Sequence, residues 1–349
     1  MMTRTVVLAL LGAAPLTGQE IVLVPGYRQE FRGLSAQGDQ LWASGRGGAY
    51  ARSTDGGRSW KSGRIPGAEQ LFLVDVQALG RDTACVLATN FDGGVGQAYR
   101  TTDGGASWAV TYRVEHPQVF LDGMAFWDRS HGVAFGDPVD GAFVVLRTDD
   151  GCESWAEVRG SALTALDGEA GFAASGTGIT TAGTAHAWIG TGGGSVARVL
   201  RSEDRGLTWN AASTPMAGGE ATGIFGIAFR DTLHGIAVAG DYQRPTGEAP
   251  TVLVTSDGGR SWSITGPAQP AGVRFGAVAL PDAGAFVAAG PSGLGISLDD
   301  GATWSPVDTL FRYGMYARDA TVWASGPAGW IARSDLSSLL RKEPRAPDR

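Results

Sequence analysis

The stretch Ser53-Thr54-Asp55-Gly56-Gly57-Arg58-Ser59-Trp60 decides the fold of this chain, because its pattern occurs six times in 349 residues. The pattern is Ser/Thr-x-Asp-x-Gly-x-Ser/Thr-Trp, with Cys152 replacing the glycine in the third copy. A sequence period near about 50 residues indicates a β-propeller or another array of stacked repeats. The copies end at Trp60, Trp108, Trp155, Trp209, Trp262 and Trp304, which lie 48, 47, 54, 53 and 42 residues apart.

Each residue type in the repeat phrase suits a tight turn that leads into a strand. An aspartate accepts backbone N–H groups within such a turn, and glycine adopts the positive φ angles that other residues avoid. The tryptophan begins the next strand and buries a large ring. We therefore assign structural roles to the six tryptophans and to the six aspartates. These aspartates are Asp55, Asp103, Asp150, Asp204, Asp257 and Asp299.

The segments around each phrase predict four antiparallel strands per repeat, which is the blade of a β-propeller. In the first repeat the three strands before the phrase cover residues 30–35, 41–44 and 49–52. A seventh, incomplete repeat covers residues 311–335, and the chain starts with an unassigned strand at residues 20–26. Adding that strand to the seventh repeat closes the ring without an open sheet edge. We predict an all-β fold, a seven-bladed β-propeller of four-stranded antiparallel blades; six blades with loose ends is the alternative.

The two ends of the chain predict the domain limits. Arg4 followed by an apolar run at residues 6–16 is typical of a secretory signal peptide, here assigned to residues 1–18. The run is too short to span a bilayer. Residues 19–336 form one propeller domain, and the polar residues 337–349 are expected to be a disordered tail. The protein is therefore expected to be exported to the periplasm or the cell exterior.

Charge and cysteine usage limit the partners and cofactors. The net charge of −7 disfavours a nucleic-acid partner. The two cysteines, Cys85 and Cys152, lack the spacing of a metal site. A disulfide between them is possible, but we favour two unreactive thiols. No metal and no cofactor are expected.

The six phrases resemble the Asp-box, or BNR, repeat proteins, a superfamily that includes sialidases and the photosystem II stability/assembly factors. The resemblance covers essentially the whole mature chain. Phe31-Arg32-Gly33-Leu34, followed by Leu41-Trp42-Ala43-Ser44-Gly45 and a phrase, looks most like the photosystem II assembly factor-like group. This resemblance implies a propeller that acts in binding or assembly.

The residues do not support two catalytic interpretations of the chain. The resemblance to sialidases would imply a Phe/Tyr-Arg-Ile-Pro segment before the first phrase, but Arg64-Ile65-Pro66 follows that phrase and comes after a glycine. The Gly-rich residues 190–194 lie between two strands, so no helix N-terminus is available for a dinucleotide. These observations disfavour a sialidase and an oxidoreductase.

Functional candidates come from the propeller face opposite the phrases, because loops carry binding while the repeats carry the scaffold. Four acids on this face would form a cluster at the channel mouth that binds a cation or a sugar, with Arg32 or Arg198 as counter-charges. These acids are Asp122, Asp137, Glu169 and Asp241. The interpretation we favour is that they cap loops and pair with arginines. Phe126, Trp127 and Phe172 are expected to pack within blades, and Tyr242 and Tyr313 to be exposed. The candidates are Arg32, Asp122, Asp137, Glu169, Arg198, Asp241 and Tyr242.

Three functions remain from the sequence, one of which is an assembly or folding factor for an envelope or membrane complex. The first is an exported, monomeric, non-catalytic propeller that binds a protein or a glycan. The alternative is a glycan-active hydrolase or lyase that uses the acidic cluster, since paired carboxylates perform glycosidic acid–base chemistry when their separation suits.

Overall fold

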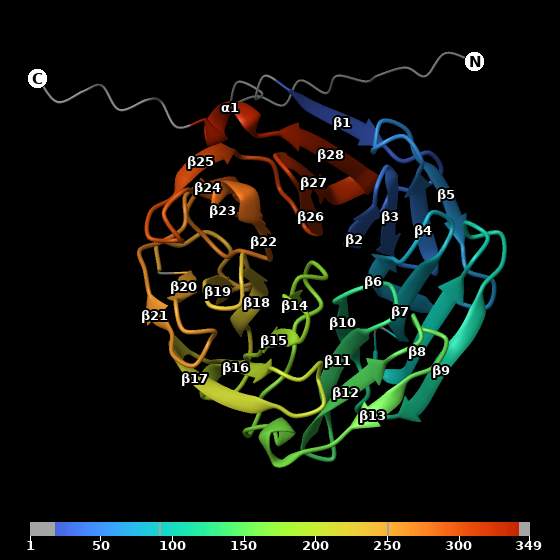
Figure 1. Ribbon diagram of the computed structural model, residues 1–349, viewed down its shortest axis with the longest axis horizontal. Coiled ribbons are helices and arrows are strands. Elements are labelled where there is room, and N and C mark those ends of the chain that lie inside the picture. The colour runs from blue at the N-terminus through green and yellow to red at the C-terminus, as the bar shows by residue number, and fades with distance from the viewer. Residues whose placement is uncertain (1–17, 91, 250, 342–349) are drawn as a thin grey trace, which may run out of the picture.

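Seven four-stranded antiparallel sheets stand around a central axis in the computed structural model, which describes residues 18–341 except Phe91 and Pro250 (Figure 1). Blades one to three consist of β2 (Phe31–Gln37), β3 (Gln40–Gly45), β4 (Ala49–Ser53), β5 (Lys61–Arg64), β6 (Leu71–Ala78), β7 (Ala84–Asn90), β8 (Gly94–Thr101), β9 (Ala109–His116), β10 (Leu121–Phe126), β11 (Gly132–Val139), β12 (Ala142–Thr148) and β13 (Ala156–Val158). Blades four to six consist of β14 (Ile179–Ala182), β15 (His186–Gly190), β16 (Val196–Ser202), β17 (Asn210–Ala217), β18 (Thr222–Phe229), β19 (Gly235–Asp241), β20 (Val252–Thr255), β21 (Ser263–Ile264), β22 (Gly276–Leu280), β23 (Ala285–Gly290), β24 (Gly293–Ser297) and β25 (Ser305–Asp308). Short 3₁₀ turns occupy Ser161–Leu163, Pro281–Ala283 and Pro327–Gly329.

Blade seven joins the two ends of the ordered chain. It contains β26 (Met315–Arg318), β27 (Thr321–Ser325), β28 (Trp330–Asp335) and the N-terminal strand β1 (Gln19–Leu23) as its outermost member. The strand β1 pairs antiparallel with β28, with Ile21 opposite Ala332 (Figure 1). The predicted seven-bladed ring closed by the N-terminal strand is therefore confirmed, and the six-bladed alternative is wrong.

The apolar core lies in layers between neighbouring blades. Inner strands such as β18 are buried on both faces, because a blade packs on each side of them. Outer strands such as β17 alternate exposed and half-buried or buried residues. Between blades four and five, Trp188 stacks on Phe229 with ring centroids 3.6 Å apart. Each blade thus depends on its neighbours for burial, as expected of a repeat array.

The repeat phrase forms a hydrogen-bonded turn, here named the box turn, between the third and fourth strands of a blade. In the first copy, Asp55 Oδ1 accepts the Ser59 backbone N–H at 2.9 Å, and Oδ2 accepts the Ser59 hydroxyl at 2.6 Å. The Gly57 backbone N–H donates to Ser53 Oγ at 2.8 Å, and Trp60 Nε1 donates to Gly57 O at 3.0 Å. Gly57 has φ +89°, which accounts for the glycine at this position.

Box turns also tie neighbouring blades together. Arg100 Nε on β8 of blade two donates to Gly151 O in the box turn of blade three at 2.9 Å. In the same way, Arg147 Nε of blade three reaches Arg205 O in blade four at 3.0 Å. Two tryptophans on second strands also reach the next box turn: Trp188 Nε1 donates to Gly258 O at 2.9 Å, and Trp323 Nε1 donates to Gly56 O at 3.1 Å. The box turn is therefore an interblade joint.

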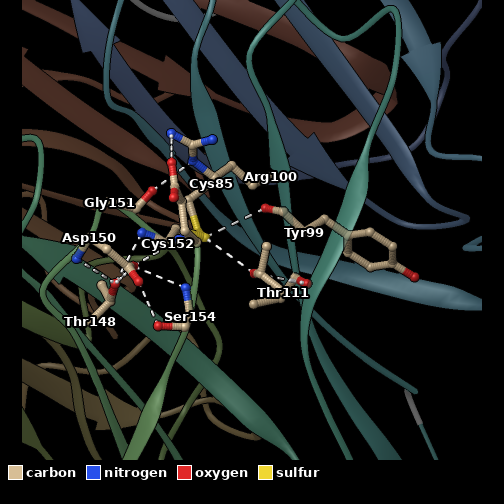
Figure 2. The surroundings of a disulfide bond; sticks show 11 residues. Cys85, Tyr99, Arg100, Thr111, Thr148, Asp150, Gly151, Cys152 and Ser154 are labelled. Carbon is tan, nitrogen blue, oxygen red and sulfur yellow. Dashed lines mark hydrogen bonds and ion pairs between the residues drawn. A yellow bond between two sulfur atoms is a disulfide. The ribbon is translucent and has the colours of Figure 1, made fainter.

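The interpretation of Cys85 and Cys152 as free thiols is wrong, because they form a disulfide with a Cα–Cα distance of 6.1 Å (Figure 2). Cys85 lies on β7, the second strand of blade two, and Cys152 lies in the box turn of blade three. The second glycine of a box turn faces the second strand of the preceding blade: a Cβ on Gly259 would lie 3.1 Å from Trp188 Cδ1. Cysteines at these two repeat positions therefore face each other across the blade boundary.

The C-terminal boundary differs from the prediction of a disordered tail from residue 337. Helix α1 (Ser337–Leu340) follows β28, and its Ser337 backbone N–H donates to Asp335 Oδ1 at 2.8 Å. Leu339 and Leu340 pack against the apolar cluster of blades six and seven, which extends the ordered chain past residue 336. The expected signal peptide and the remainder of the expected tail lie outside the described residues, apart from Gly18 and Arg341.

Candidate functional site

The link face is the side of the ring opposite the box turns, and it carries the loops between second and third strands and the links between blades. Its most unusual part is residues 172–178, an irregular stretch before β14 that we name the axial segment. In Figure 1 the green chain before β14 reaches toward the ring axis. The inner strand of blade four, β14, starts only at Ile179 and therefore does not occupy this position.

The axial segment is held by blades on several sides of the axis. Arg32 Nη1 of blade one donates to Ala174 O at 3.1 Å. From blade five, the Ile227 backbone N–H donates to Thr177 O at 2.8 Å. From blade six, the Ala277 backbone N–H donates to Thr177 Oγ1 at 3.2 Å. The segment therefore crosses the axis and connects blades that are distant in sequence.

A cavity of about 350 Å³ lies in the channel beside the axial segment. Gly176 and Thr177 contribute to its wall, together with later residues of the inner strands such as Met124, Ile227 and Tyr316. Its lining contains no charged side chain. The acidic candidates therefore do not line this cavity.

Asp122 and Asp137 are brought together beneath the start of the axial segment. Asp122 lies at a bulge of β10 and is 2% exposed, and its Oδ2 has no hydrogen-bond partner. Asp137 Oδ1 accepts the Gly171 backbone N–H at 2.8 Å. Burial raises the pKa of Asp122, and the Asp137 carboxylate raises it further. Burial also raises the pKa of Asp137 to about 6, against the lowering effect of the hydrogen bond from Gly171.

Glu169 and Arg198 form a buried ion pair rather than an open site. Arg198 Nε donates to Glu169 Oε1 at 2.9 Å, and Arg198 Nη2 donates to Oε2. The Thr191 hydroxyl and the Leu166 backbone N–H donate to the two carboxylate oxygens, at 2.5 and 2.8 Å. The carboxylate is thereby fully hydrogen-bonded, which is what a buried charge requires. The pair fixes the chain that leads into the axial segment.

The remaining charged candidates have separate partners. The Arg32 guanidinium lies 4.1 Å above the centre of the Tyr313 ring and 3.6 Å from Glu30 Oε1. Asp241 Oδ1 accepts the Gln243 backbone N–H at 2.8 Å, as a loop cap. The structure thus joins Asp122 with Asp137 and Glu169 with Arg198, and gives Arg32 and Asp241 other roles.

Aromatic side chains from blades four to seven form a continuous patch on the link face, which we name the aromatic surface. Phe225 lies beneath it, 4.4 Å from Phe172 and 5.9 Å from Phe275 between ring centroids. The Phe275 and Tyr313 rings are nearly parallel, with centroids 5.9 Å apart. Tyr242 is 45% exposed, and the other rings of the patch are partly exposed. The aromatic surface consists of Phe172, Tyr242, Phe275, Phe311 and Tyr313.

Sequence reasoning missed Phe275 and Phe311 and placed Phe172 among the packing residues only. A usable signal was present: an aromatic residue followed by glycine enters the inner strand of blades five, six and seven. These dipeptides are Phe225-Gly226, Phe275-Gly276 and Tyr313-Gly314.

Asp75 on β6 was also missed, because it stands within the apolar run Leu73-Val74-Asp75-Val76. It is 1% exposed and accepts the backbone N–H groups of Val76 and Met124 at 2.8 and 2.9 Å. Burial raises the pKa of Asp75 to about 8. A Cβ on Gly176 would lie 2.8 Å from Asp75 Oδ1, so this carboxyl backs onto the axial segment.

Within the described part of the chain, no three His, Cys, Asp or Glu side chains are grouped to hold a metal ion. The helices in these same residues include none that is long and apolar enough to cross a membrane.

Comparisons with known proteins support the resemblance found on the repeats. No protein-family model matches the chain. The photosystem II assembly lipoprotein Ycf48 of Synechococcus sp. (strain CC9902) is 37% identical over 89 residues, which are 24% of this chain and 24% of that protein. The chain thus spans about a quarter of the length of the curated relative it matches.

Two solved structures share the fold. The structure of YCF48 bound to D1 peptide has a TM-score of 0.65 and 13% identity, and covers 92% of this chain and 96% of its own. The WD40 propeller domain of Doa1 has a TM-score of 0.63 and 12% identity, and covers 93% of this chain and 99% of its own. At such identities the structures establish the propeller fold alone. The match to Ycf48 confirms the predicted similarity to the photosystem II assembly-factor group.

Proposed function

We propose that this chain is an exported, non-catalytic protein-binding module that assists the assembly of a membrane protein complex and binds its partner through the aromatic surface. The observation that carries the proposal is the patch itself, which spans four blades on the link face and leaves Tyr242 45% exposed. Tyrosine and other aromatic residues dominate the binding energy of protein interfaces. A rigid propeller presents them at a fixed spacing.

The named relatives favour a protein partner over a glycan. The relative with a sequence match is named an assembly lipoprotein, and a structural neighbour is described as bound to a D1 peptide. We extend from these proteins to this chain only the class of ligand, a peptide segment.

The disulfide supports export. Disulfides persist in oxidising compartments such as the periplasm and are rare in the cytosol. The Cys85–Cys152 bond therefore agrees with the signal peptide proposed for residues 1–18.

No observation favours the glycan-hydrolase alternative. A hydrolase needs two carboxyl groups that face the scissile bond. Asp122 is 2% exposed, and Glu169 is engaged by Arg198. We therefore propose no catalytic role for these acids.

The test is site-specific photo-crosslinking in the host envelope. A benzoylphenylalanine replaces Tyr242 in one variant and Leu207 in a matched control, since Leu207 is 54% exposed in the box turn of blade four. We expect a crosslink to a membrane-complex subunit from position 242 and none from position 207. A Tyr242→Ser change without the crosslinker should weaken capture about 30-fold, the effect of losing an aromatic anchor of about 2 kcal/mol. Crosslinks from position 207 alone would contradict the proposed face.

A further inference from the structure

The Asp122–Asp137 pair is directly connected to the aromatic surface. Asp137 Oδ1 accepts the Gly171 backbone N–H at 2.8 Å. Asp122 Oδ2 lies so close to Gly171 Cα that a side chain could not be added there. The next residue, Phe172, packs its ring against Phe225 and Tyr242, with centroids 4.4 and 6.3 Å away. The two carboxyl groups therefore set the position of one ring of the docking surface.

Among the described residues, no arginine, lysine or histidine forms an ion pair with Asp122 or Asp137, and the two candidate counter-charges, Arg32 and Arg198, have other partners. Arg32 donates to Ala174 O and stacks on Tyr313. Arg198 is paired with Glu169. The third acid at the axial segment, Asp75, faces Gly176 and is bonded to backbone N–H groups. The remaining neighbours of Gly171 include the uncharged Phe135 ring.

Two carboxyl groups in such surroundings cannot both carry a charge at low cost. Like charges at close range, out of water, disfavour double ionisation. While at least one proton is present, the pair tolerates its buried position. When the last proton leaves, Asp122 Oδ2 becomes a charged oxygen without a donor, and the stable outcome is water entry and displacement of the chain at Gly171.

We propose, building on the function proposed above, that the Asp122–Asp137 pair is a proton-operated latch that holds Gly171 and Phe172 in the aromatic surface. With a proton bound, the surface is complete and docks an apolar peptide segment of the partner. Without it, the start of the axial segment is released and docking weakens. The partner is thus bound at mildly acidic pH and let go as the pH rises.

The pKa values of the two carboxyl groups agree with loss of the proton in the physiological pH range. Burial raises the pKa of Asp137 to about 6, and that of Asp122 lies well above its usual value. Asp75 has a pKa of about 8 and backs onto the same segment at Gly176, so its contribution has to be separated by experiment.

Hydrogen exchange of the intact mature protein tests the latch without any partner. Protection of the amides in residues 170–178, corrected for the intrinsic pH dependence of exchange, is measured between pH 5.5 and 8.5. Above the pKa of the pair we expect protection to fall about tenfold per pH unit. Asp122→Asn keeps the side-chain size and removes one charge, so its protection should stay constant over this range. Asp137→Asn serves the same purpose if the first variant does not fold.

Two matched variants separate the alternatives. Asp241→Asn alters a loop-capping carboxylate of the same face and should keep the wild-type pH response. Asp75→Asn should also keep it. An unchanged wild-type protection from pH 5.5 to 8.5 overturns the latch, as does a response that disappears only in Asp75→Asn. The crosslinking experiment from position 242, repeated at pH 5.5 and 8.5, reports partner binding separately, so a failed docking proposal is distinguishable from a failed latch.

Discussion

Removal of the interblade disulfide gives the sharpest test of how the ring is stabilised. The perturbation is the double variant Cys85→Val/Cys152→Gly, which installs residues that other blades already use. Val133 occupies the position of Cys85 in blade three, and Gly206 occupies that of Cys152 in blade four. The variant therefore removes the bond and leaves an ordinary box turn.

The expected magnitude follows from the loop that the bond closes. A crosslink across a sequence separation of 67 residues stabilises the native state by about 4 kcal/mol through the entropy of the unfolded chain. Glycine at position 152 offsets about 1 kcal/mol, because Cys152 has φ +72°, a conformation that glycine adopts without strain. We expect the free energy of unfolding to fall by about 3 kcal/mol.

The assay is urea unfolding of residues 19–349, followed by tryptophan fluorescence and circular dichroism in parallel. The midpoint should shift down, and the slope should rise, because the unfolded chain without the crosslink is less compact and exposes more surface. Both cysteines are 0% exposed, so a reductant should lower the wild-type midpoint only after cycles of unfolding, whereas the variant should be insensitive to it. A variant with the wild-type midpoint would refute the reasoning, because the bond would then add nothing to the packing of blades two and three.

Three further predictions follow from the box turn, the buried ion pair and the buried acids. Asp103→Ala removes the acceptor of the Ser107 N–H and hydroxyl and should lower the melting temperature while capture of the partner by the folded protein persists; an unchanged melting curve would contradict this role. Arg198→Met strands the Glu169 carboxylate and should cost about 3–5 kcal/mol, most of which the added change Glu169→Gln should restore in denaturant titrations. Asp75 has a pKa raised to about 8 and stays protonated when folded, so the native state binds more protons than the unfolded chain between about pH 4 and 8. The contribution of Asp75 to stability should therefore fall as the pH rises through that window, by up to about 1.4 kcal/mol per unit, and Asp75→Asn should remove that part of the slope in unfolding measured at each pH.

The repeat made the architecture predictable. The spacing of the tryptophans and the chemistry of the phrase are local properties, and each copy carries its own turn. Even the ring closure followed from counting strands, since the seventh repeat lacked one and residues 20–26 supplied it. The same logic placed Arg32 on the inner strand of blade one and Tyr242 in the loop after the second strand of blade five.

Residue placement around the axis could not be predicted, because the axial segment breaks the repeat. Its path is set by contacts with blades one, five and six, which no local pattern encodes. The sequence left an open acidic cluster as an alternative to the favoured interpretation, in which these acids cap loops and pair with arginines; in the structure Asp122 is buried and Glu169 pairs with Arg198. The prediction of two free thiols failed for a related reason, since the pairing of Cys85 with Cys152 depends on which residue of a neighbouring blade faces the box turn.

The closure of blade seven has a consequence for how the molecule comes apart. Arrays with free ends lose their terminal units first, because each outermost unit contacts only one neighbour. Here Gln19 lies opposite Ser334, so the first and last strands share one sheet and neither can fray alone. Detachment of β1 would leave the ladder groups of β28 unpaired, an edge open to another chain. The pairing of β1 with β28 therefore closes the ring, and we expect unfolding and misassembly to start at this pair of strands.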